Sequence, residues 1–257
     1  MKPKDLKNIL GDLEEPTAEK KLKVERDEVL DEIVSRIHAG FERQLSRDWD
    51  APKVINFEKD KIPPQAISRF ADSIFAYKDE KEFLNTAYEF IIKLIQNSYN
   101  AGHNDFSLRL PWQNYYCGNR IVGPAGTPEK KLRIEIKNGV GEFAFFGAEN
   151  ISVKITGSAA YNLGSRSCDS DFTVLGNVKD HCGYEAAKVS YEICGNADEF
   201  MLSWSKDCKA LVHKNAGKFC GAFAKNPNIT VLGRVGHGFT MQATKTALQA
   251  IMEKNET

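Results

Sequence analysis

Two aspartates and an upstream Gly-Ser pair are the residues whose types and spacing best fit catalysis. Asp169 and Asp171 stand two residues apart, and ten residues separate them from Gly157-Ser158. On a strand, residues two apart share a face, so both carboxylates could hold Mg²⁺ against triphosphate oxygens. A Gly-Ser pair at the start of a helix would bind the phosphates through free backbone N–H groups. This hypothesis of nucleotide chemistry depends on which elements carry the four residues.

Those elements follow from a 19-residue repeat that begins near residue 131. Branched apolar residues recur at this spacing six times running, at Ile136, Ile155, Val174, Ile193, Val212 and Val231. Two more columns, one two residues earlier and one four residues later, keep the same spacing and are also apolar. A fixed period near 20 with apolar columns indicates a solenoid, in which each coil must stack on the next to bury its inner face.

Each repeat contains a short stretch of alternating apolar and polar residues, as in Ile151–Ile155. Period two predicts a strand with one inward face, so stacked coils would form a parallel sheet with equivalent residues about 4.8 Å apart. The spacing is not a multiple of six, which argues against a hexapeptide helix, and the pattern of a leucine-rich repeat is absent. We therefore predict an α+β fold: a helical N-terminal region followed by a parallel β-helix of about six coils.

Glycine follows most of the predicted strands, where a sharp corner requires either a positive φ or a close approach between backbones. The glycines expected to be structural are Gly157, Gly176, Gly195, Gly217, Gly221 and Gly233. Beside them, Asn177, Asn196 and Asn215 fall in one column. Repeated asparagines in stacked sheets form ladders of amide hydrogen bonds, and we expect one here.

Stacking would also bring potential metal ligands together. Cys194 and His213 are one period apart, so their side chains should be neighbours on an outer face or corner. The pair suits a soft metal, but a tetrahedral site needs four ligands and no further column supplies them. Cys182, Met201 and Cys220 share another column and are expected to fill the interior. The main prediction is that no cofactor is bound, with Cys194 and His213 left open as a metal alternative.

The first hundred residues follow a helical period instead. Apolar residues recur every three or four positions over 29–45, and similar stripes begin at Pro64 and Phe83. At the other end, a short helix is expected to cap the stack, because open strand edges invite aggregation. The predicted domains are a helical region over 1–102, strand and loop over 103–130, the β-helix over 131–240 and a C-terminal helix over 241–257.

Composition narrows the classes of function. The 257 residues include 35 basic and 35 acidic side chains, and this balance argues against a nucleic-acid binder. No apolar stretch is long enough to span a bilayer, and the start lacks the apolar run of a secretory signal, so no membrane partner is expected. The six cysteines lack CxxC spacing and are most simply reduced thiols, as in a cytoplasmic protein.

The corner glycines carry a family resemblance. The segments Gly157–Gly164, Gly176–Gly183 and Lys214–Gly221 each hold two of the glycines of a G-xx-G-xxx-G pattern, although no repeat holds all three. Together they resemble the motif of the GXGXG β-helix family, over residues 131–240. That family includes the C-terminal domain of the glutamate synthase large subunit and the β-helix subunit of formylmethanofuran dehydrogenases.

What this resemblance implies is a structural role, since the β-helix of glutamate synthase is a spacer and the chemistry resides in other domains. We expect a non-catalytic scaffold or assembly module, working with a protein partner or as a homo-oligomer. The alternative is an enzyme: Gly157-Ser158 with Asp169 and Asp171 resembles the GS…DxD motif of polymerase-β-type nucleotidyltransferases, which use Mg²⁺.

Overall fold

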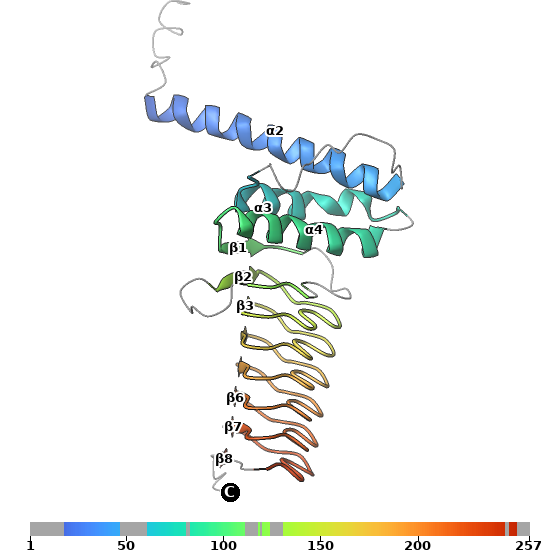
Figure 1. Ribbon diagram of the computed structural model, residues 1–257, viewed down its shortest axis with the longest axis vertical. Helices are drawn as coiled ribbons and strands as arrows, with labels where there is room; N and C mark the ends of the chain where they lie inside the picture. The colour runs from blue at the N-terminus through green and yellow to red at the C-terminus, as the bar shows by residue number, and fades with distance from the viewer. Residues whose placement is uncertain are drawn as a thin grey trace, which may run out of the picture.

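The computed structural model describes residues 18–46, 61–80, 83–110, 118, 120–123, 131–244 and 247–250. Helices stand at one end of a long stack of coils whose strands lie one above another (Figure 1). The helices are α2 (Ala18–Ser46), α3 (Pro64–Ser73), the 3-10 helix η1 (Ile74–Tyr77) and α4 (Phe83–Asn100). The strands are β1 (Asp105–Leu108), β2 (Leu132–Ile136), β3 (Ile151–Ile155), β4 (Asp171–Val174), β5 (Ser190–Ile193), β6 (Lys209–Val212), β7 (Asn228–Val231) and β8 (Ala247–Ala250). The predicted α+β architecture, with helices followed by a parallel β-solenoid, is confirmed.

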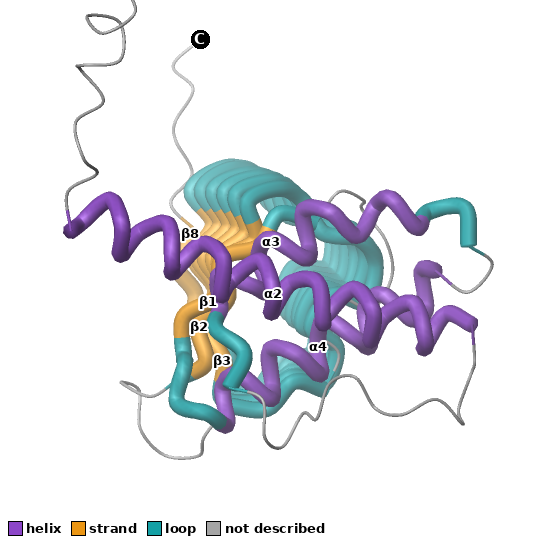
Figure 2. Tube along the Cα trace, turned by 90° about the horizontal axis from the view of Figure 1, so that it is seen from above, coloured by secondary structure: helices purple, strands orange, loops and turns teal. Residues whose placement is uncertain are grey.

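The strands form one parallel sheet in which each strand pairs with the next in sequence. Ile155 lies opposite Val174 and Val174 opposite Ile193, so residues 19 apart are neighbours as the period predicts. The same step continues from β2 to β8. A view down the stack shows the coils superimposed on one another (Figure 2). A second column outside the strands is joined by parallel bridges at Val140, Ala159, Val178, Ala197, Ala216 and Val235.

The sheet extends beyond the predicted coils at both ends. In the region predicted as strand and loop, β1 pairs with β2. At the other end, the predicted helix over 241–257 is wrong for Ala247–Ala250, which form β8 against β7; residues 251–257 lie outside the described residues. Ala243 and Leu248 fit a helical stripe, but Leu248 is also one period after Ile229 and pairs with it. The open edge of β7 therefore determines the conformation of this segment.

Helices α3 and α4 close the first end of the stack. Pro64 begins α3, as predicted, because a first-turn residue needs no N–H for the helix. The buried side chains of α3 and α4 join the interior of the solenoid in one continuous core. They include Ala66, Ile67, Phe70, Ala71, Ala87, Phe90, Ile91 and Leu94. Within the described residues, no helix combines the length and the apolar character that crossing a bilayer requires.

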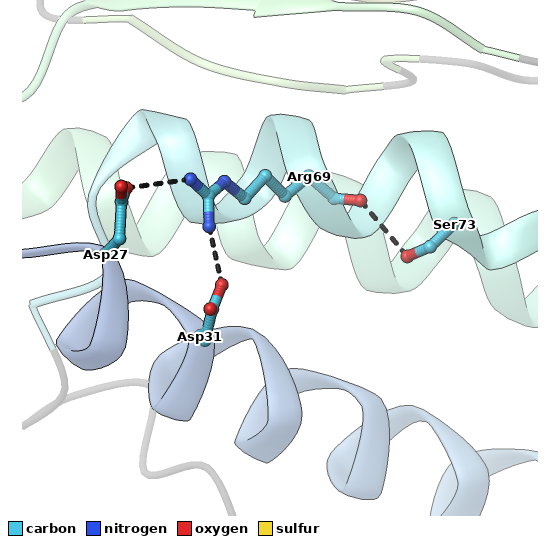
Figure 3. A network of polar contacts seen from close by, with 4 residues as sticks. All are labelled: Asp27, Asp31, Arg69 and Ser73. Atoms are coloured by element: carbon cyan, nitrogen blue, oxygen red, sulfur yellow. Dashed lines mark hydrogen bonds and ion pairs between the residues drawn. The ribbon is translucent and has the colours of Figure 1, made fainter. Parts of the chain in front are cut away.

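Helix α2 lies across the outer side of this cap and is held by both apolar and polar contacts. Phe41 is fully buried, with its ring centroid 5.6 Å from that of Phe70. At the surface, Arg69 Nη2 lies 3.1 Å from Asp27 Oδ1, and Nη1 lies 2.5 Å from Asp31 Oδ1 (Figure 3). Exposed ion pairs contribute at most about 1 kcal/mol each, so the buried rings provide most of the attachment.

His38 adds a polar contact between α2 and the α3–η1 segment. Its Nε2 lies 2.8 Å from Ser73 Oγ and its Nδ1 lies 3.0 Å from the Tyr77 hydroxyl oxygen. Tyr77 in turn donates to Glu42 Oε1 at 2.7 Å. Burial lowers the pKa of His38 below 6.5, with Glu42 opposing the shift. The folded protein therefore favours the neutral imidazole.

Each coil turns back through two overlapping turns. In the coil over 171–189, the N–H groups of Tyr184 and Ala186 each donate to the carbonyl three residues earlier, at 3.1 Å. The third residues of these turns, Gly183 and Glu185, have positive φ, as type II turns require. The same positions are left-handed in the neighbouring coils, mostly without glycine. We call the surface formed by these turns, residues 180–186 and their 19-residue equivalents, the turn edge.

The glycine column after the strands has a different cause, because Gly157, Gly176 and Gly195 are not left-handed. A Cβ on Gly176 would lie 2.7 Å from both the carbonyl carbon and the carbonyl oxygen of Gly157. Of the two reasons that the sequence left open, close approach between stacked backbones therefore applies at these three glycines.

We expect Gly176→Ala to lower the free energy of unfolding by about 1–3 kcal/mol, the usual cost of overpacking, measured by chemical denaturation. Lys214→Ala is the matched control, since Lys214 occupies the same column with an exposed side chain and its truncation should change little. Equal unfolding free energies for wild type and Gly176→Ala would contradict the close-approach explanation.

A second prediction concerns pH. Because the pKa of His38 is lower in the folded state, the unfolded state binds the proton first, and stability is lost as pH falls from 6.5 through the folded pKa. Urea denaturation at about pH 7.5 and about pH 5.5 should show a larger loss for wild type than for His38→Gln. The same pH dependence in both proteins would refute this role of His38.

Candidate functional site

The asparagine column forms a hydrogen-bond ladder along the stack. Ser158 Oγ accepts the backbone N–H of Asn177 at 3.0 Å, and Asn177 Oδ1 accepts that of Asn196 at 2.8 Å. Asn196 Oδ1 accepts from Asn215 at 3.1 Å, and Asn215 Oδ1 from Arg234 at 2.9 Å. The donors are backbone groups, so this is not the amide-to-amide ladder expected from the sequence. Each rung satisfies a backbone N–H at a corner.

The remaining structural glycines fall into two groups. A Cβ on Gly217 would lie 2.8 Å from the backbone of Asp198, and one on Gly233 would lie 2.6 Å from the carbonyl oxygen of Lys214. Gly221 instead has a φ of +69° and belongs to the turn edge. The repeated glycines therefore serve two physical requirements that the sequence pattern does not distinguish.

The structure does not assemble the residues of the nucleotide hypothesis. Ser158 lies in the corner after β3, whereas Asp169 lies in the turn before β4 and Asp171 begins that strand. The length of a strand therefore separates the hydroxyl from the carboxylates. After Gly157-Ser158 the chain continues into Ala159, which bridges to the coils on either side, rather than into a helix.

Both aspartates are paired with lysines of other coils, Asp169 with one in the next coil and Asp171 with one two coils earlier. Lys131 Nζ donates to Asp171 Oδ2 at 2.7 Å, and Lys188 Nζ lies 4.0 Å from Asp169 Oδ1. Lys188 is the residue one period after Asp169, so this contact is a consequence of stacking. These pairs occupy the carboxylates that the hypothesis assigned to Mg²⁺.

The structure does bring Cys194 and His213 together, and it adds Glu192. One donor atom from each of the three side chains lies within 4.8 Å of the others. His213 Nε2 is 3.1 Å from Glu192 Oε1. Cys194 is half-buried and the other two are exposed. Comparison of residues 19 apart misses Glu192, because it lies 21 residues before His213 and meets it diagonally.

The other sulfur column fills the interior, as predicted. Cys182, Met201 and Cys220 are each at most 1% exposed. Burial raises the pKa of Cys220 to about 12 and raises that of Cys182 as well. These thiols stay protonated near neutral pH, so they serve packing and are poor nucleophiles or metal ligands.

Aromatic rings stack along the turn edge, a feature that the alternating strand pattern does not reveal. The ring centroids of His181 and Phe200 are 5.0 Å apart, and those of Phe200 and Phe219 are 5.2 Å apart. Trp204 stacks on Phe223 at 4.7 Å, and Trp204 is 58% exposed. The signal available in the sequence is that Phe200 and Phe219, like Trp204 and Phe223, are 19 residues apart.

A shallow hollow of about 470 Å³ lies over the outward face of β1 to β4. Its charged groups are paired across adjacent strands: Arg133 Nη2 donates to Asp105 Oδ2 at 2.6 Å, and Lys154 Nζ lies 3.1 Å from Glu135 Oε1. The hydrogen bond from Arg133 lowers the pKa of Asp105. These four charges are satisfied by one another, which leaves the hollow weakly suited to bind a charged ligand.

The fold and these surfaces define the class of the chain as a helix-capped parallel β-solenoid. A scan against family models finds no family that matches the chain, and searches of curated proteins and of solved structures also find no match.

The ladder yields a third prediction. Asn196→Ala removes the acceptor for the N–H of Asn215, and we expect it to lower the free energy of unfolding by about 0.5–1.5 kcal/mol in chemical denaturation, the usual net contribution of one exposed hydrogen bond. Asn196→Ser is the control, because Ser158 performs the same role in this column with a hydroxyl. If the serine and alanine variants lose equal stability, the hydrogen bond is not the stabilising interaction.

Proposed function

We propose that the chain is a non-catalytic scaffold, a stiff rod that works as a subunit or assembly module through contact with a protein partner or a second copy. The observation that supports this proposal most directly is the unbroken register from β2 to β8. A rod of stacked coils holds whatever binds its two ends and sides at fixed separations.

The stiffness has several sources that act in the same direction. Over the coils of β3 to β7, the parallel sheet, the bridge column and the asparagine ladder each join one coil to the next through backbone N–H groups. Opening one coil would break all three kinds of contact with both neighbours. Repeat proteins of this kind gain stability from such interfaces between neighbouring repeats.

The turn edge is the surface that we assign to partner contact. Trp204 is 58% exposed at a backbone position with a φ of 60°, where a side chain with a Cβ is disfavoured. Neither burial in the core nor backbone preference accounts for a tryptophan there. Exposed tryptophans are frequent anchors of protein interfaces, since the large ring is buried when a partner binds.

The resemblance to the GXGXG β-helix family adds to this proposal, because a spacer role is what that resemblance implies. A cytoplasmic location is part of the proposal. Its support is that the five described cysteines, Cys168, Cys182, Cys194, Cys208 and Cys220, are free thiols, the form that a reducing compartment maintains.

The fourth prediction tests the proposal on the full chain. Purified from its native cells, the protein should elute with a stoichiometric protein partner or as a homo-oligomer, measured by size-exclusion chromatography with light scattering. Trp204→Ala should weaken that association at least about tenfold with little change in melting temperature, as for an interface anchor.

Leu175→Ala is the control, since Leu175 is 45% exposed on the same stack but outside the turn edge, and its truncation should leave the association intact. A wild-type chain that is monomeric and free of partners at every concentration would contradict the scaffold proposal. An association that Trp204→Ala leaves unchanged would contradict the assignment of the turn edge.

A further inference from the structure

Glu192, Cys194 and His213 form a cluster on the outward face of adjacent strands. Glu192 and Cys194 are two residues apart along β5 and its extension, so their side chains point to the same side. The backbone fixes the third member: the N–H of His213 donates to the carbonyl of Ile193 at 2.9 Å, and that of Cys194 to Val174 at 2.9 Å. The register therefore fixes the three side chains close to one another on one face.

Two of the three donor atoms are already spaced as zinc ligands would be, and the third lies nearby. Nitrogen and oxygen ligands about 2.0–2.1 Å from a tetrahedral ion lie roughly 3.3 Å from one another. The observed separation between His213 Nε2 and Glu192 Oε1 is 3.1 Å, and a donor atom of Cys194 lies within 4.8 Å of both. Binding one ion would therefore require the Cys194 side chain to approach the other two donors.

We propose that Glu192, Cys194 and His213 bind one Zn²⁺ ion on the outer face of the solenoid. A thiolate, an imidazole and a carboxylate are the three donor types that zinc accepts in proteins. On binding, the thiol proton of Cys194 is released to solvent and the neutral imidazole of His213 supplies its lone pair. The ion replaces the contact between His213 and Glu192 that forms without it.

The fourth coordination position faces solvent. Of the residues that continue these columns, Leu175, Leu211 and Leu232 offer no ligand atom. Thr173, next to Glu192, offers only a neutral hydroxyl, which is not among the usual zinc ligands, and Glu192 and His213 are exposed. Water would complete the tetrahedron, which is the ligand arrangement of an open rather than a closed zinc site. The ion would also join the coil of β5 to that of β6. This site does not depend on the proposed scaffold function, and either can fail without the other.

Titration of the metal-free full chain with ZnCl₂ alone, followed by calorimetry and elemental analysis, should give one ion per chain. Co²⁺ in place of Zn²⁺ should give a thiolate-to-cobalt charge-transfer band and the intense visible bands of tetrahedral coordination. Cys194→Ser, His213→Gln and Glu192→Gln should each weaken binding at least about tenfold. Cys168→Ser is the matched control, as another half-buried thiol outside the cluster, and should bind like wild type.

A measurement on the unaltered chain keeps the test independent of variant folding. Zn²⁺ should slow the alkylation of Cys194 by iodoacetamide at least about tenfold, measured on its peptide by mass spectrometry, and should leave Cys168 unaffected. Equal protection of both thiols, absence of the thiolate–cobalt band, or a stoichiometry unchanged by Cys194→Ser would each overturn the proposal.

Discussion

The 19-residue register is the constraint on which the rest of the structure depends. The backbone hydrogen bonds of the parallel sheet hold residues 19 apart at about 4.8 Å, so each inward side chain is packed chiefly against its two column neighbours. Val174 lies between Ile155 and Ile193, and all three are fully buried. Large rings enter the interior as a stacked pair, Phe172 on Tyr191, with centroids 5.1 Å apart and planes 9° apart. Each inward residue must therefore fit the residues 19 before and 19 after it, so a whole column must pack together.

Many of the left-handed, non-glycine residues of the solenoid lie in the turn edge. Left-handed residues other than glycine cost about 1–2 kcal/mol each, and His181, Phe200 and Phe219 occupy one such column. Ring stacking returns about 0.5–1.5 kcal/mol per pair beyond burial, which offsets a share of that cost. The backbone hydrogen bonds of each turn and between coils also stabilise the turn edge. An aromatic column is thus more favourable here than the same residues would be in an isolated turn.

The sequence predicted the solenoid because inward columns repeat at one fixed spacing, and periodicity of that kind has few structural explanations. It predicted the contact between Cys194 and His213 for the same reason. The period could not predict contacts between residues whose separation is not a multiple of 19. Glu192, 21 residues before His213, is such a case, because it contacts His213 diagonally. The segment of Ala247–Ala250 was misassigned because a short apolar stripe fits both a helix and a strand, and only the unpaired edge of β7 selects the strand. The sequence also could not tell whether a glycine is needed for a positive φ or for close approach between backbones, because glycine meets both requirements.

In several surface columns, the register places opposite charges next to each other. Like charges repeated in one column would lie about 4.8 Å apart and cost roughly 1–3 kcal/mol per contact, between the dielectric of water and that of a protein surface. Lys179 instead faces Asp198, with Nζ and Oδ2 2.9 Å apart. Where two acids are adjacent, Asp180 Oδ1 accepts the backbone N–H of Glu199 at 2.9 Å, and Glu199 pairs with Lys218 at 3.3 Å. Each exposed pair adds little stability by itself. A register slipped by one residue, however, would break these ion pairs and turn the apolar columns outward. The ion pairs between adjacent coils therefore favour the same alignment as the buried core.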